Sequence, residues 1–391
     1  MKIDQINLYH FRNYESLQFS PDEGVNLLYG SNGSGKTNIL EAIHYCALGR
    51  SHRTNSDRDV ILQDQDTGAC GVKVTKEHGQ VDIATKFYKN EHQSKQYFIQ
   101  RKKVSRSSDL MGNLNIVIFS PEDLMLIREG PQLRRRYLDM MISQVNSSYY
   151  LSLQNYQKAL MQRNALLKES KKNNIQLNDL YESFENQIAI SSSIIIPERR
   201  KMIQRIQNIS KDIYINISRT NFECFDLSYS SCCDADNDQI EKKIQNQLYQ
   251  DREMDIMRGF TSHGVHREDI LIRLNGKDMK LFASQGQMRT AALSMKLAQI
   301  QIFYDITKEY PVLLLDDVMS ELDMTRRTQL IDSFKHLQTF ITCTDESDFD
   351  SDIKRAVFHV IKNEQQLGYL DIHAEIKKND KSEYVDEPDF S

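Results

Sequence analysis

Residues 30–37 read Gly-Ser-Asn-Gly-Ser-Gly-Lys-Thr, and residues 312–323 read Val-Leu-Leu-Leu-Asp-Asp-Val-Met-Ser-Glu-Leu-Asp. The first stretch fits the pattern G-x-x-x-x-G-K-[ST], in which glycines let successive backbone N–H groups face a phosphate. The second stretch is a short apolar run that ends in two acids. Together they predict the two halves of one ATP site, separated in the chain by a long insert.

The segments on either side of the phosphate loop favour this interpretation. Residues 25–29 read as a buried strand, and apolar side chains then recur at helical spacing from Ile39 until Gly49. A phosphate would therefore lie at a helix N-terminus, where unpaired N–H groups and the macrodipole favour anions. We expect Lys36 to reach the β- and γ-phosphates and Thr37 to place its hydroxyl on Mg²⁺. The predicted nucleotide-binding residues of the loop are Gly30, Ser31, Asn32, Gly33, Ser34, Gly35, Lys36 and Thr37.

The two acids at 316 and 317 complete the predicted site. Residues 312–315 are too few for a helix and too apolar for an edge strand, so they indicate a central parallel strand. Asp316, at its carboxyl end, is placed to hold Mg²⁺, which prefers carboxylate oxygen and water. Asp317 is the candidate base that orients the attacking water, so that Lys36 and Asp317 are the predicted catalytic residues. The alternative is a pair of acids that only ends a strand.

Residues 284–287, Ser-Gln-Gly-Gln, form a third motif, which we call the signature segment. They precede a helical pattern, and a Ser-x-Gly turn that opens a helix is another anion site. The segment resembles the signature of ABC-type ATPases, which in that superfamily closes on the γ-phosphate of the opposite subunit. The resemblance makes Ser284, Gly286 and Gln287 nucleotide contacts. Many members carry a switch histidine after a later strand, whereas this chain has Thr342 there.

Several further blocks are similar to bacterial RecF proteins. They are residues 7–14, 49–54, 120–124, 130–139 and 266–269, and with the motifs above they run in the expected order to about residue 345. The chain departs from the family's usual pattern at Arg128 and Glu129, and at Val265, where a proline is common. None of these departures touches the predicted nucleotide-binding residues.

The RecF resemblance implies an ATP-dependent DNA-binding protein of recombinational repair and replication restart. The resemblance implies that an ATP-driven homodimer clamps gapped duplex or single-stranded DNA and helps RecR and RecO to load RecA. Slow, DNA-dependent ATP hydrolysis would then release the dimer from the DNA. ATP and Mg²⁺ are the implied cofactors. One alternative is an SMC-like scaffolding or defence ATPase. Another, the ATPase subunit of a membrane transporter, is less favoured because those domains place the signature much closer to the phosphate loop.

Composition restricts the location and the partners. The chain has 391 residues, a net charge of −5 and six cysteines without metal-ligand spacing. It contains no apolar run of membrane-spanning length and no evident secretory signal, so we expect a cytoplasmic, nucleoid-associated protein without a membrane partner. Basic residues cluster at 86–106, at 134–136 and at 199–205. Each cluster could neutralise DNA phosphates or be an ordinary solvated face, and the second could hold two lobes together.

The order of patterns predicts an α/β fold. An ABC-type P-loop ATPase lobe, with a mixed sheet and helices, is built from residues 1–119 and 285–370. A mostly helical second lobe, residues 120–284, is inserted and carries the signature segment at its end. We expect Pro197 to end or kink a helix of this lobe. Residues 371–391 form an acidic C-terminal tail.

Overall fold

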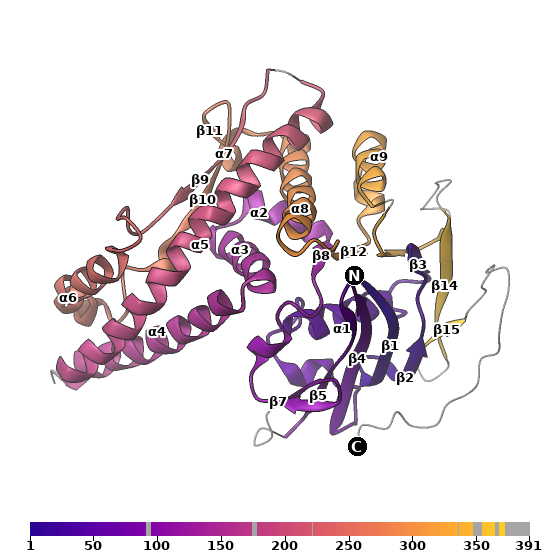
Figure 1. Ribbon diagram of the computed structural model, residues 1–391, viewed down its shortest axis with the longest axis horizontal. Coiled ribbons are helices and arrows are strands. Elements are labelled where there is room, and N and C mark those ends of the chain that lie inside the picture. Colours follow the sequence, from indigo (N-terminus) through magenta and orange to yellow (C-terminus); the bar gives the residue numbers. More distant parts are fainter. Residues whose placement is uncertain are drawn as a thin grey trace. The chain divides into compact units, whose positions relative to one another are not determined.

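The computed structural model describes residues 1–90, 95–173, 178–220, 222–334, 336–346, 354–363 and 367–371. The chain forms two compact units, the first from Met1–Pro121 with Phe303–Ser391 and the second from Glu122–Ile302 (Figure 1). The predicted acidic tail lies outside the described residues, apart from Asp371.

One boundary of these units differs from the expected one. The sequence assigns residues 285–302 to the ATPase lobe, whereas the structure groups them with the second unit. These residues belong to α8 (Gln285–Thr307), which packs against neighbours in that unit. The Tyr137 hydroxyl donates to the Met295 carbonyl at 3.0 Å, and Lys296 pairs with Asp123 at 2.8 Å.

The first unit contains two six-stranded sheets. The antiparallel sheet has the order β2-β1-β4-β5-β6-β7, and the other has the order β15-β14-β3-β13-β12-β8, parallel except for the β14–β15 pair. Its strands are β1 (Lys2–Phe11), β2 (Tyr14–Phe19), β3 (Val25–Tyr29), β4 (Thr67–Lys76), β5 (Gly79–Tyr88), β6 (Gln96–Ile99), β7 (Lys102–Val104), β8 (Ile116–Phe119), β12 (Val312–Asp316), β13 (Thr339–Cys343), β14 (Arg355–Lys362) and β15 (Gly368–Asp371). Its remaining elements are α1 (Lys36–Leu48), α9 (Met324–Ser333), η1 (Asp57–Val60), η2 (Ser107–Leu110) and η5 (Met319–Glu321).

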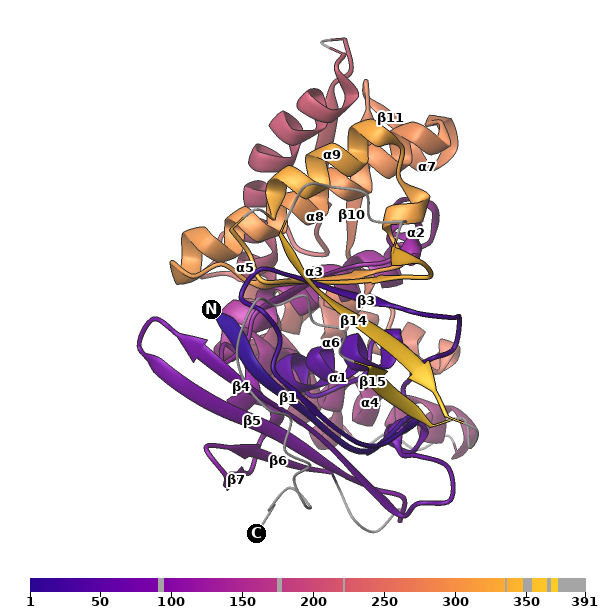
Figure 2. The ribbon, with the colours of Figure 1, turned by 90° about the vertical axis from the view of Figure 1, so that its right-hand side faces the viewer.

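Helix α1 joins the two sheets. It contacts strands of both, and almost all of its residues are buried; Figure 2 shows it between them. The parallel sheet places β13 between β3 and β12, so that Tyr29 lies opposite Cys343 and Asp316 lies opposite Thr342. The predicted central parallel strand at 312–315 is confirmed. The carboxyl ends of β3 and β12, which carry the phosphate loop and the two acids, therefore meet at one edge of the sheet.

The second unit is mostly helical, with a small antiparallel sheet of order β11-β10-β9. Its elements are η3 (Pro121–Leu124, which begins at the boundary), α2 (Met125–Arg128), α3 (Pro131–Val145), α4 (Ser147–Asn173), α5 (Asn178–Ser218), β9 (Phe225–Ser230), α6 (Ile240–Arg258), η4 (Val265–Arg267), β10 (Asp269–Leu274), β11 (Lys277–Asp278), α7 (Met279–Phe282) and α8. In the part of the chain that the structure describes, no helix is both long and apolar enough to cross a membrane.

Helix α5 continues through Pro197, so of the two predicted outcomes, an end or a kink, the first is wrong. Proline costs the helix one hydrogen bond and crowds the preceding turn. Here Ile195 and Ile196 before it and Met202 after it are all buried. Packing on both sides of the proline therefore outweighs its unfavourable propensity.

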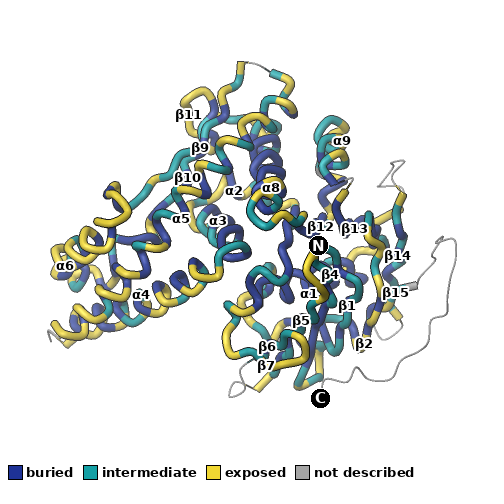
Figure 3. Tube along the Cα trace, in the orientation of Figure 1, coloured by how far each residue is buried: buried dark blue, intermediate teal, exposed yellow. Residues whose placement is uncertain are grey.

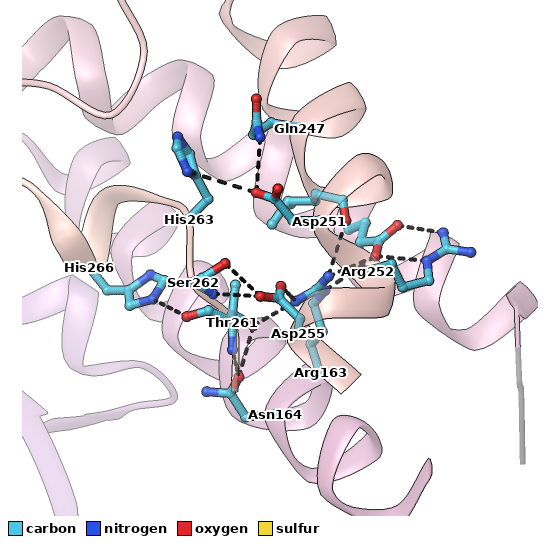
Figure 4. Close-up of polar contacts among 12 residues, drawn as sticks. Arg163, Asn164, Gln247, Asp251, Arg252, Asp255, Thr261, Ser262, His263 and His266 are labelled. Atoms are coloured by element: carbon cyan, nitrogen blue, oxygen red, sulfur yellow. Dashed lines mark hydrogen bonds and ion pairs between the residues drawn. The ribbon is translucent and has the colours of Figure 1, made fainter. Parts of the chain in front are cut away.

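A buried ion-pair cluster connects α4, α5 and α6 (Figure 4). Arg163, which is fully buried, pairs with Asp255 at 2.7 Å and with Glu185 at 3.1 Å. Arg252 binds the second oxygen of Glu185 at 2.7 Å. Because each buried charge has an opposite charge within hydrogen-bond distance, the cost of desolvation is offset and the three helices are held in one register.

One arginine in each of two basic clusters is held by similar pairs. Arg134 binds Asp269 through two hydrogen bonds of 2.7 and 2.8 Å, and buried Arg199 binds Asp139 and Glu268, each at 2.8 Å. All of these partners belong to the second unit. In the cluster at 86–106, Lys102 is an exposed residue of β7; Figure 3 shows exposed chain at this strand of the first unit.

His266 is expected to make the stability of the second unit depend on pH. Its Nδ1 lies 2.6 Å from the Tyr156 hydroxyl and its Nε2 lies 3.1 Å from the Thr261 carbonyl. The carbonyl can only accept, so Nε2 carries the proton and Nδ1 accepts from Tyr156. Burial, only partly opposed by the Thr261 contact, lowers the pKa of His266 to about 4. The folded protein therefore holds this imidazole neutral.

We expect this histidine to weaken the fold in mild acid. In the unfolded chain His266 binds a proton below its ordinary pKa of about 6.5, whereas in the folded protein it stays neutral down to about pH 4. The free energy of unfolding therefore falls as the pH falls from about 6.5 to about 4. Between pH 7 and pH 5 the loss is about 2 kcal/mol. Denaturant unfolding of the wild type and of His266→Gln, which can keep both hydrogen bonds but does not titrate, measures it. Equal pH dependence in the two proteins would refute the assignment.

Candidate nucleotide-binding site

The phosphate loop joins β3 to α1, and its backbone needs glycine at two positions. Gly30 has φ of 148° and Gly35 has φ of 120°, both outside the range that side chains tolerate. A Cβ atom on Gly30 would overlap the Val360 carbonyl, and one on Gly35 would lie 2.7 Å from the Tyr14 hydroxyl. The loop is therefore packed against β14 and β2, and only glycine fits there.

Lys36 lies inside this loop. Its Nζ donates to the carbonyl of Gly30 at 2.6 Å and to that of Ser31 at 3.0 Å, and the side chain is buried. Burial lowers the pKa of Lys36, and the charges of Asp317 and Asp316 oppose this effect. A cation held in the curl of the loop suits a phosphate group, whose charge would also oppose the desolvation.

Thr37 and Asp316 are 279 residues apart in the sequence and are in contact in the structure. The Thr37 hydroxyl donates to Asp316 Oδ1 at 2.8 Å. A hydroxyl and a carboxylate in contact fit Mg²⁺, which takes few protein ligands and keeps water and phosphate oxygens as the others. Among the described residues no group of three or more His, Cys, Asp or Glu side chains could hold a metal. The pair of Thr37 and Asp316 fits Mg²⁺ bound together with a nucleotide, whose phosphate oxygens and water would complete the coordination.

Thr342 links the two acids, a role that sequence reasoning missed. Its hydroxyl donates to Asp316 Oδ1 at 2.8 Å and accepts from the Asp317 backbone N–H at 2.9 Å. Asp317 has φ of 53°, a left-handed conformation that is uncommon for aspartate and marks a constrained site. In the sequence, position 342 was notable only because it lacks a histidine. The register of β12 and β13, which places Thr342 opposite Asp316, shows why the threonine can bind both acids.

Asn13 is a second missed residue, in the turn between β1 and β2. Its side chain donates to the Ser34 carbonyl at 2.8 Å and accepts from Asn38 at 2.7 Å. Its own carbonyl accepts from Gly368 N at 2.8 Å. Asn13 therefore connects the phosphate loop, the first turn of α1 and β15. It belongs to the block at 7–14, but nothing in that block indicates this contact.

The signature segment lies in the second unit, whereas the phosphate loop lies in the first. The hydroxyl of Ser284 accepts from Gln287 N at 3.2 Å, and the side chain of Gln287 accepts from Ser284 N at 2.8 Å. This reciprocal pair caps the N-terminus of α8. Ser284 is exposed, and Gln287 also binds Glu223 at 2.6 Å. The predicted helix start is confirmed, while contact with nucleotide stays a prediction.

Comparison with known proteins identifies the family. A family model described as "RecF/RecN/SMC N terminal domain" matches residues 2–367. A "DNA replication and repair protein RecF" of Clostridium botulinum (strain ATCC 19397 / Type A) is 38% identical over 365 residues, which cover 93% of this chain and 98% of that protein. This chain belongs to the RecF family. The resemblance found in the sequence is thereby confirmed.

Other RecF proteins agree over similar lengths. RecF of Alkaliphilus oremlandii (strain OhILAs) is 38% identical over 371 residues, with 93% of this chain and 100% of that protein covered. A solved structure described as "Structure of the recombination mediator protein RecF-ATP in RecFOR pathway" superposes with a TM-score of 0.86 at 34% identity, covering 95% of this chain and 97% of that one. The predicted fold, a RecF-type ATPase of two lobes, is confirmed.

Proposed function

We propose that this chain is an ATP-dependent DNA-binding protein of recombinational repair and replication restart, with weak DNA-dependent ATPase activity. The observation that carries the proposal is the 2.8 Å contact between Thr37 and Asp316, which joins a phosphate loop to a Mg²⁺-binding acid within a RecF fold. The RecF relatives are named as DNA replication and repair proteins, and the solved neighbour is described with ATP.

Each residue of the site has a separate role in this proposal. Bound Mg²⁺·ATP supplies the phosphoryl group that is transferred to water. Lys36 neutralises phosphate charge, and the N–H groups of the loop bind the phosphate oxygens. Thr37 and Asp316 hold Mg²⁺. Asp317 orients the attacking water and takes its proton. Because aspartate reaches less far than the glutamate that many ABC-type ATPases carry there, hydrolysis is slow, which suits a switch.

The proposed working form is a homodimer. The signature segment, with Ser284, Gly286 and Gln287, contacts the γ-phosphate bound to the phosphate loop of a second copy. ATP then favours the closed dimer because it binds that state more tightly than the monomer, and hydrolysis removes the preference. A closed dimer can clamp DNA at a single-strand gap. RecR, RecO and RecA are the proposed partners there, in keeping with the pathway named for the solved neighbour.

Binding to gapped DNA tests this function. With a non-hydrolysable ATP analogue we expect at least tenfold tighter binding to a gapped duplex than without nucleotide, measured by gel shift at fixed salt because phosphate contacts depend on salt. Lys36→Ala is the control, since it removes the nucleotide effect alone. Equal affinity with and without nucleotide would refute the ATP-gated clamp.

The second candidate is an SMC-like scaffolding or defence ATPase, because the matching family model also covers RecN and SMC proteins. Such a protein would dimerise with ATP yet show no preference for gapped over intact duplex. The same gel shift, repeated with an ungapped duplex of equal length, separates the two functions.

Substitution of Thr342 tests the proposed Mg²⁺-binding role of Asp316. Thr342→Val keeps the shape of the side chain but leaves the Asp317 N–H without its acceptor and removes a donor from Asp316. An unsatisfied buried group costs about 1–3 kcal/mol, so we expect the Mg²⁺ concentration for half-maximal ATPase to rise about tenfold. Nucleotide binding without Mg²⁺ should not change, and Thr342→Ser should behave as the wild type. A valine variant with normal Mg²⁺ dependence would contradict this role.

A further inference from the structure

The outer face of the antiparallel sheet contains a hollow of about 240 Å³. Its floor is made by small residues, Gly71 on β4 and Ala84 on β5, which lie opposite each other in register. The neighbouring positions Val72 and Ile83 alternate to the buried side of the sheet. The hollow is therefore on the face turned away from the core, and it has no part in the nucleotide site described above.

The rim of the hollow is cationic and partly aromatic. Lys73, Lys86 and Arg101 line it, and Asp82 is the only acid among its lining residues. Phe98 contributes an aromatic ring. Asn7 also lines the hollow, and its Oδ1 atom is buried without a hydrogen-bond partner. A buried acceptor favours a ligand with N–H donors, such as a peptide, over a phosphate backbone, which offers only acceptors.

The C-terminal segment of this chain has the complementary chemistry. The RecF family model ends at residue 367, so the tail lies beyond the family's shared sequence. Residues 383–391 read Glu-Tyr-Val-Asp-Glu-Pro-Asp-Phe-Ser, which contains four acids, two aromatic residues and no basic residue. Such a segment can pair carboxylates with the cations of the rim and place a ring beside Phe98.

The tail is long enough to reach the hollow. In sequence it follows β15, and β15 contacts β2, the strand that supplies Gln18 to the hollow. From β2 across β1 and β4 to β5 is about 15 Å at the usual strand spacing. The connecting residues 372–382 can span about 35 Å when extended. Tethering through a linker of this length gives a local concentration in the millimolar range, so even a weak contact would be occupied.

We propose that residues 383–391 bind the hollow formed by β1, β4, β5 and β6 of the same chain. Bound there, the acidic segment covers Lys86 and Arg101 and satisfies Asn7 through its backbone N–H groups. A cationic surface is thereby withheld from other polyanions, including nucleic acid, until the tail is displaced.

Photocrosslinking in the full-length protein tests this proposal. With p-benzoylphenylalanine in place of Phe390, we expect crosslinks to peptides that contain Gly71, Ala84 or Phe98. Lys86→Glu should lower their yield at least fivefold, and combining it with Glu387→Lys should restore part of it. Lys102→Glu is the matched control, because Lys102 is an exposed lysine of the same sheet that does not line the hollow. Circular dichroism confirms that each variant folds.

Three results would overturn the proposal. The first is crosslinking to another surface, and the second is a yield unaffected by Lys86→Glu. The third is crosslinking only between chains in a mixture of light and isotope-labelled protein, which would make a second copy the occupant. If single-stranded oligonucleotide binding stays unchanged when the four tail acids are replaced by their amides, the shielding role is wrong. None of these measurements depends on ATP, so the proposed clamp can fail while this inference stands.

Discussion

Lys36→Ala is expected to lower the affinity for Mg²⁺·ATP at least a hundredfold. In the structure the Lys36 ammonium is already held by the Gly30 and Ser31 carbonyls inside the phosphate loop, so no rearrangement is needed to meet a phosphate. Two of the three N–H groups of the ammonium bind these carbonyls, so the third remains for a phosphate oxygen. That charge-assisted hydrogen bond contributes about 1.5–3 kcal/mol, and the attraction between the ammonium and the phosphate charge adds to it. Titration with a fluorescent ATP analogue measures the change.

The stability of Lys36→Ala provides its control. Burial lowers the pKa of Lys36, which shows that the folded protein bears a cost for this charge. The alanine variant should therefore unfold at a similar or slightly higher denaturant concentration than the wild type without nucleotide. It should also lose the stabilisation that ATP gives the wild type. Unchanged ATP affinity in a well-folded Lys36→Ala protein would mean that the loop does not bind phosphate.

Ser284→Arg is expected to abolish ATP-dependent dimerisation while leaving ATP binding to the monomer within about twofold of the wild type. Ser284 is exposed at the start of α8, so an arginine there would meet the second copy rather than the core of its own unit. The substitution also removes the Ser284 cap on Gln287, at a cost of about 1 kcal/mol. Ser284→Ala is the matched control, because it removes the hydroxyl without adding bulk. It should still dimerise, though more weakly, since Gly286 and Gln287 keep their proposed contacts.

Local patterns predicted those parts of the site whose geometry follows from secondary structure. The phosphate loop lies between a strand and a helix, and Asp316 ends a parallel strand, so both had to lie at one edge of the sheet. The hydroxyl of Thr342 could not be foreseen, because its position depends on β13 lying between β3 and β12. That order comes from long-range pairing, which no local pattern encodes.

The basic clusters also show that local sequence patterns do not reveal long-range contacts. Arg134 and Arg199 are indistinguishable in the sequence from surface residues that would bind DNA, because their partners Asp269 and Glu268 are far away in the chain. The boundary at residue 285 was misplaced for a related reason. The Ser-x-Gly turn predicted the start of α8, but nothing in the local sequence predicted that this helix packs against Tyr137 and Asp123.

The central claim is that two copies of the chain complete each other's ATP site. Sedimentation velocity with a non-hydrolysable ATP analogue tests it most directly, on the wild type, Ser284→Ala and Ser284→Arg at one protein concentration. The account predicts dimers for the first two proteins and monomers with bound nucleotide for Ser284→Arg. Dimers of Ser284→Arg as stable as those of the wild type would contradict it.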